Sequence, residues 1–132
     1  MIAVYLMCSL LVLALLTAFV CFLMAFYAPR QKTDQGFTLP PGEIYLPYHD
    51  IMKQWNDEVS AMAHESVWIT SHDKLKLHGK YYEYAPGAPM ELMLHGYRGS
   101  AERDLCGGVQ RAFALGRNVL IVDQRACGKS EG

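Results

Sequence analysis

Two short segments of the chain combine residue types that could do catalytic chemistry. Residues 94–100 read Leu-His-Gly-Tyr-Arg-Gly-Ser, and residues 123–130 read Asp-Gln-Arg-Ala-Cys-Gly-Lys-Ser. Each follows an apolar run, at 90–94 and at 118–123, of the kind that forms a buried strand. Open α/β sheets bind ligands beyond the carboxyl ends of their strands. The sequence therefore predicts that both segments lie at the ligand-binding edge of such a sheet.

The last five residues, 128–132, match the pattern Gly-x-Ser-x-Gly, in which a serine nucleophile occupies a tight turn between a strand and a helix. About six residues separate Ser130 from the expected end of the preceding strand near Asp123, which is too many for such a turn. We therefore interpret Ser130 as a loop serine that imitates the motif, and we assign no nucleophile within this chain. The Gly-Lys-Ser triplet does not predict a phosphate-binding loop either, because the required glycine falls at Asp123.

No metal or cofactor site is predicted. Cys106 could act as a nucleophile only beside a histidine, and its expected position on a buried helix makes this a weak alternative. Cys106 and Cys127 form neither a metal-ligand spacing nor a disulfide framework. The histidines outside the 94–100 segment lack a cysteine or carboxylate at metal-ligand spacing, so we expect surface or packing roles for His49, His64, His72 and His78.

The elements that must position these segments are those of an α/β sheet. Aromatic and β-branched runs at 65–71 and 74–84 flank a short turn and predict a β-hairpin. Alternation within the second run predicts one buried face, carrying Leu75, Leu77 and Tyr81.

After the hairpin, the sequence predicts a strand at 90–94, a helix at 101–115 that ends before Gly116, and a buried strand at 118–123. Hairpin, strand, helix and strand in this order predict the start of a mostly parallel sheet with right-handed crossovers.

This order of elements and motifs resembles the N-terminal third of the α/β-hydrolase family, particularly its serine aminopeptidase-like and esterase-like branches. The resemblance covers residues 65–132 and rests on the loop His-Gly-x-x-Gly at 95–99 together with Asp-x-Arg-x-x-Gly-x-Ser at 123–130. It implies an α/β-hydrolase fold of which this chain holds the beginning, an incomplete domain. One departure is Ala126, where the family's loop usually reads Arg-Gly. Alanine is small, and we expect the turn to form.

The resemblance implies that the loop after the 90–94 strand supplies a main-chain N–H to an oxyanion hole, which stabilises the charge that develops on a carbonyl oxygen during acyl transfer. By position in the motif, the donor is Tyr97, and Gly96 gives the backbone room to approach a substrate. The competing interpretation is a plain strand-to-helix turn in which His95 is hydrogen-bonded locally.

Asp123, Arg125 and Gly128 are predicted to be loop scaffold. An ion pair or backbone hydrogen bonds from the two charged side chains would fix the loop beside the site. Asp123 is an improbable triad acid, because in the α/β-hydrolase family the acid and the histidine follow the serine in the chain.

The N-terminal residues 1–28 contain no charged side chain, whereas all 12 Lys/Arg and all 13 Asp/Glu lie further along the chain. About 25 apolar residues are enough to span a bilayer, which predicts a transmembrane anchor that contacts lipid through residues 2–27. A cleaved signal peptide and a buried soluble helix are the alternatives. The run lacks the basic residues that precede a signal peptide's apolar stretch. Arg30 and Lys32 follow the run, so the positive-inside bias favours a single-pass protein whose soluble part is cytoplasmic.

Between the anchor and the sheet, residues 29–47 are rich in proline and predict a linker. Residues 48–64 carry apolar side chains at helical spacing and predict an amphipathic helix. Residues 65–132 then form the sheet-containing part.

Together these features predict a membrane-anchored serine hydrolase of esterase or peptidase type that acts through an acyl-enzyme on a small-molecule or peptide substrate. We expect the nucleophile, acid and histidine beyond Gly132, and these 132 residues alone to be inactive and unstable. The alternatives are a non-catalytic membrane-tethered binding protein with the same fold, and an epoxide- or haloalkane-type hydrolase. A net charge of −1 gives no reason to expect nucleic acid binding.

Overall fold

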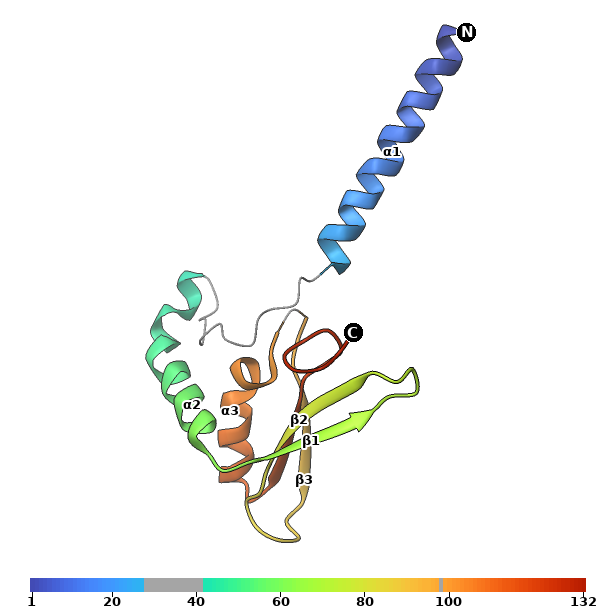
Figure 1. Cartoon of the computed structure of the whole chain (residues 1–132). Coiled ribbons are helices and arrows are strands. Elements are labelled where there is room, and N and C mark those ends of the chain that lie inside the picture. The colour runs from blue at the N-terminus through green and yellow to red at the C-terminus, as the bar shows by residue number, and fades with distance from the viewer. Residues whose placement is uncertain (28–41, 98) are drawn as a thin grey trace.

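The computed structural model describes residues 1–27, 42–97 and 99–132. The order of the elements is α1 (Ile2–Phe26), the 3-10 helix η1 (Glu43–Tyr48), α2 (His49–Ala61), β1 (Glu65–Thr70), β2 (Lys76–Tyr82), β3 (Met90–Leu94), α3 (Ala101–Ala114) and β4 (Asn118–Val122). The part from β1 onward is the predicted hairpin, strand, helix and strand (Figure 1).

The sheet has four strands in the order β1-β2-β4-β3. β1 and β2 are the antiparallel hairpin, β2 also pairs antiparallel with β4, and β3 pairs parallel with β4. β4 lies between two strands and has the continuous apolar sequence that a strand covered on both faces requires. Because β3 and β4 are parallel, the segments at 95–100 and 123–130 leave the sheet at the same edge.

Helix α3 packs on β3 and β4, and α2 packs on α3 (Figure 1). The core therefore lies between α3 and one face of the sheet, and it consists of Val59, Tyr82, Met93, Ala101, Cys106, Val109, Ala112, Val119 and Ile121. The two helices approach closely at Gly107, where an added Cβ would lie 3.0 Å from the ring of Trp55.

The C-terminal end of α3 is closed as the sequence predicts. Gly116 has a φ of +69° and donates to Phe113 O at 3.0 Å, while Arg117 N donates to Ala112 O at 3.0 Å. These are the two bonds of a Schellman motif, for which glycine is favoured because it adopts a positive φ without strain.

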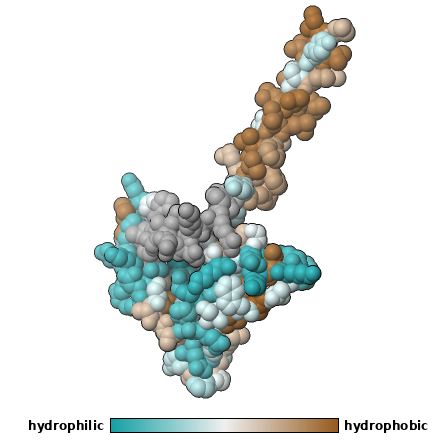
Figure 2. Space-filling view, viewed as in Figure 1, coloured by the Kyte–Doolittle hydropathy of each residue, from teal (hydrophilic) through white to brown (hydrophobic). Residues whose placement is uncertain are grey.

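Helix α1 is 25 residues long, has no buried residue, and is apolar along its length (Figure 2). At about 1.5 Å of rise per residue it is long enough for a hydrocarbon core of about 30 Å. It is the one helix among the described residues that is long and apolar enough to cross a membrane.

Three sequence-based predictions differ from the structure. Residues 43–47 of the predicted linker form most of η1, and the rest of that linker, up to residue 41, lies outside the described residues. The amphipathic helix is shorter than 48–64, because α2 ends at Ala61. The buried face of β2 is also the opposite one, since His78 and Tyr82 are buried while Leu75, Leu77 and Tyr81 are only half-buried.

The physical reason for the last error is a polar partner that lies far away in the sequence. His78 is buried because its ring contacts Asp123, a residue 45 positions further along the chain. Alternation of hydropathy within β2 does not indicate such a partner, so only a surface or packing role was predicted for His78.

Candidate active site

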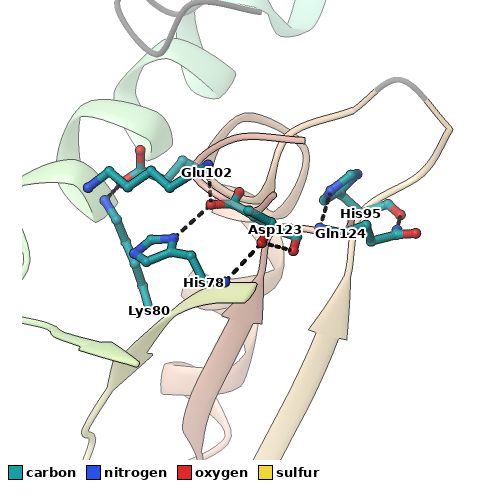
Figure 3. Close-up of polar contacts among 8 residues, drawn as sticks. His78, Lys80, His95, Glu102, Asp123 and Gln124 are labelled. Atoms are coloured by element: carbon teal, nitrogen blue, oxygen red, sulfur yellow. Dashed lines mark hydrogen bonds and ion pairs between the residues drawn. The ribbon is translucent and has the colours of Figure 1, made fainter. Parts of the chain in front are cut away.

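His95 lies at the carboxyl end of β3, is buried, and joins the two predicted loops (Figure 3). Its Nε2 accepts a hydrogen bond from the main-chain N–H of Gln124 at 3.1 Å. Since the amide is always a donor, the proton of a neutral His95 ring is on Nδ1, which contacts Gly96 O at 2.8 Å. The Gln124 side-chain amide in turn donates to His95 O. The loop after β3 is thereby fixed to the loop after β4.

The peptide between Gly96 and Tyr97 is oriented by these contacts. Gly96 O accepts from Gly99 N at 3.1 Å as well as from His95 Nδ1. A trans peptide is planar and its N–H points opposite to its C=O, so the Tyr97 N–H is directed away from His95 and Gly99. An added Cβ at Gly96 would meet no heavy atom within 4 Å. The backbone of Gly96 therefore borders open space on the side where a Cβ would lie.

The Tyr97 side chain points toward α1. It is 73% exposed, and its hydroxyl donates to Ala25 O in the last turn of α1. The last four carbonyls of a helix have no partner within the helix, and this contact satisfies one of them. The side chain of Tyr97 is therefore held at the end of α1.

Asp123 lies at the end of β4 and makes several of the hydrogen bonds that hold the second loop (Figure 3). Its main-chain N–H donates to His78 O at 3.0 Å, and its carboxylate contacts His78 Nδ1 at 2.7 Å. The Lys129 N–H donates to the same carboxylate at 3.1 Å, which closes the loop on itself. The structure thus gives Asp123 a scaffold geometry.

Ser130, the last residue of this loop, is fully buried. Its hydroxyl donates to Asp123 O at 2.6 Å and accepts from the main-chain N–H of His78 at 2.9 Å. Serine, histidine and aspartate meet here, but not as a catalytic triad, because the Ser130 hydroxyl contacts the His78 backbone instead of its ring. The ring's Nε2 is buried and has no hydrogen-bond partner among the described residues. This geometry favours a structural serine.

Arg125 binds the hairpin turn. Its guanidinium donates through two nitrogens to the two carboxylate oxygens of Asp73, one of them at 2.9 Å. These hydrogen bonds, with a further one from Ser71, hold the pKa of the Asp73 carboxyl well below its usual range, and the same pair raises the pKa of Arg125. Asp123 and Arg125 are therefore each paired with the hairpin and not with each other.

Two residues of the second loop have the left-handed backbone that favours glycine. Gly128 has a φ of +53°, and an added Cβ would overlap the Asp123 carboxylate. Ala126 has a φ of +60°, at the position where the resemblance leads one to expect glycine. The turn forms with alanine, as expected, in a conformation that costs an L-residue about 1–2 kcal/mol.

The two cysteines of the sheet-containing part have the surroundings of structural thiols. Cys106 is buried on α3, donates to Arg103 O at 3.4 Å, and has a pKa raised by burial. The pKa of Cys127 is raised for the same reason. A nucleophilic cysteine needs the opposite shift. Among residues 1–27, 42–97 and 99–132 there is no cluster of three potential metal ligands.

Three contributors to these loops were not identified from the sequence: His78, Gln124 and Asp73. Each acts through a partner 29 or more positions away. His78 carried a usable signal, since a histidine inside an otherwise half-buried strand indicates a buried polar partner. Asp73 and Gln124 have the composition of ordinary loop residues, and only the strand register brings them to their partners.

No family model matches the chain. The chain is similar to solved structures of the Pyrococcus furiosus esterase Pf2001 in two crystal forms. One is 31% identical with a TM-score of 0.51, over 58% of this chain and 30% of the esterase. The other is 29% identical with the same TM-score, over 58% and 29%. A structure of the DcsB complex with its substrate analogue is 26% identical with a TM-score of 0.46, over 53% and 24%.

The chain thus spans less than a third of the length of the esterase structures that it matches. The chain has a mixed α/β architecture with a four-stranded sheet, and part of it shares its fold with an esterase at 31% identity. These similarities identify a hydrolase-like fold.

Proposed function

We propose that this chain is the N-terminal part of a membrane-anchored serine hydrolase of esterase or peptidase type that acts through an acyl-enzyme. In this proposal the Tyr97 N–H is one donor of the oxyanion hole. The nucleophile, the acid and the catalytic histidine come from sequence that follows Gly132, and α1 is the anchor.

The orientation of the Gly96–Tyr97 peptide is the observation that carries the proposal. Its carbonyl is held by two donors, so its N–H points out of the loop at the carboxyl end of β3. A donor fixed before the reaction stabilises a developing oxyanion without reorganisation, and removing one such donor typically lowers turnover about 10²–10³-fold. The link from His95 to Gln124 supplies the rigidity that this role needs.

The surroundings of Ser130 and Cys106 support a nucleophile outside this chain. A nucleophilic serine must present its hydroxyl to the substrate, whereas the hydroxyl of Ser130 is buried between Asp123 O and His78 N. The raised pKa of Cys106 disfavours the thiolate.

The anchor and its orientation rest on the sequence. The length and composition of α1 suit a single membrane span. Arg30 and Lys32, which favour a cytoplasmic location for the sheet, lie outside the described residues.

The test uses the complete open reading frame that contains this chain. A fluorophosphonate probe, which labels activated serines, should modify the protein at a serine beyond position 132, and Ser130→Ala should leave labelling unchanged. Loss of labelling in Ser130→Ala would make Ser130 the nucleophile and overturn the assignment. Absence of any labelling in a folded protein would instead favour the non-catalytic binding protein or the non-acyl hydrolase.

A further inference from the structure

η1 places four large apolar or aromatic side chains in solvent immediately after the segment that follows α1. Ile44 is 75% exposed and Leu46 is 59% exposed, and Tyr45 and Tyr48 are exposed beside them. Among the elements of the described residues, η1 packs chiefly on α2. Its six residues carry a single charge, at Glu43, and no basic side chain. A short helix that exposes this many apolar side chains to water is energetically unfavourable.

The position of η1 in the molecule indicates what covers it. Residues 28–41 join it to α1, and 14 residues extend at most about 50 Å. Figure 1 shows η1 and the loop between β3 and α3 at the end of the folded part that faces α1.

The loop between β3 and α3 is joined to α1 directly. The Tyr97 hydroxyl donates to Ala25 O, in the last turn of the helix that we propose to span the bilayer. A span of about 30 Å places that turn at the level of the lipid headgroups. Tyrosine is favoured at this level, because its ring is apolar and its hydroxyl stays hydrated.

From these observations we infer that η1 and Tyr97 form a second, interfacial contact with the bilayer surface, so that the carboxyl edge of the sheet faces the membrane. The inference rests on the proposed anchor. The contact is apolar and not electrostatic, because residues 43–48 contain no Lys or Arg. It should therefore be independent of anionic lipid.

Carbene photolabelling from within the lipid phase tests the inference on the full chain in phosphatidylcholine liposomes. Peptide mapping should find label on α1, on residues 43–48 and on Tyr97. Met90 and Leu115 are matched controls, because they are 61% and 56% exposed and lie at the opposite edge of the sheet. At least a five-fold excess of label on 43–48 over these controls is the result expected.

The outcomes separate the inference from the anchor. Label on α1 with 43–48 no higher than Met90 and Leu115 overturns the interfacial contact and leaves the anchor in place. Absence of label on α1 itself overturns both.

A variant and a lipid series sharpen the test. Ile44→Ser combined with Leu46→Ser should reduce label on 43–48 to the level of the controls without changing label on α1, whereas Met90→Ser should change neither. Label that persists on 43–48 in the double variant, or that appears only when phosphatidylglycerol is added, would contradict an apolar contact.

Discussion

At the scale of single residues, the candidate site depends on a few polar side chains that orient backbone. His95 holds the carbonyl of Gly96 and receives the N–H of Gln124, so one imidazole sets the direction of a peptide and the distance between two loops. Asp123 and Ser130 do the same for the loop after β4. The motif indicates the role that we propose for Tyr97, whereas the long-range partners of His95 and Asp123 could not be predicted, because they depend on register.

Three glycine-related substitutions in the loops should have different effects on stability. Gly128→Ala places a Cβ in the Asp123 carboxylate at a positive φ and should destabilise the fold by about 1–3 kcal/mol. Ala126→Gly removes the left-handed strain and should stabilise it by about 0.5–1 kcal/mol. Gly96→Ala, in open space, should change little. Denaturant midpoints of the complete protein in detergent measure all three, and a neutral Gly128→Ala would contradict the loop geometry.

The pair of Asp73 and Arg125 predicts a pH dependence. The pKa of Asp73 is lowered by the pairing, so its contribution to stability is complete above the unfolded-state pKa, about 3.9, and is lost as the pH falls through the lower folded value. Asp73→Asn should therefore lower the denaturant midpoint at pH 7, and the difference from the parent should shrink in acid and in high salt. A difference that grows as the pH falls would exclude this pairing as its cause.

At the scale of elements, the hydropathy pattern predicted most of the helices and strands. The strands at 65–70, 90–94 and 118–122 and helix α3 were predicted within about two residues, because each has a continuous apolar run or stripe with a clear stop signal. η1 was not predicted, since Pro47 is compatible with a 3-10 turn as well as with a linker, and α2 ends at Ala61 instead of residue 64. The prediction of the buried face of β2 was wrong, because the burial of His78 depends on its contact with Asp123, which follows β4.

The pairing of β2 with β4 should be sensitive to Gly79. A Cβ at this position would lie 2.9 Å from Ile121 O, which is backbone in the central strand and cannot move away as a side chain could. Gly79→Ala should therefore destabilise the chain by about 1–3 kcal/mol and reduce amide-exchange protection in both strands. Gly96→Ala, which meets nothing within 4 Å and does not require a positive φ, serves as the comparison for space alone. Equal protection in Gly79→Ala and the parent would contradict the close approach.

At the scale of the whole molecule, the chain combines an apolar helix with a sheet whose carboxyl edge lies toward it (Figure 1). Hydropathy predicted α1, and the two motifs predicted the edge. The position of α1 relative to this edge could not be predicted from the sequence, because it depends on the contact of Tyr97 with the end of α1.

The anchor predicts behaviour during fractionation. Expressed in bacteria, the full chain should pellet with membranes and resist carbonate extraction, because about 25 apolar residues make insertion favourable. A variant lacking residues 2–27 should leave the membrane fraction. Recovery of the intact chain as a soluble protein with Met1 present would contradict the anchor.

The central claim is that the Tyr97 main-chain N–H stabilises an oxyanion, and proline tests it most directly because it removes that donor from the backbone. Proline also fixes φ, so the fold of the variant must be checked alongside its turnover. In the complete protein, Tyr97→Phe should hydrolyse a p-nitrophenyl ester within a few-fold of the parent. Tyr97→Pro should lower kcat by about 10²–10³-fold with little change in KM, while amide-exchange protection of β4 stays at the parent level. Turnover by a folded Tyr97→Pro within ten-fold of the Tyr97→Phe rate would contradict the account.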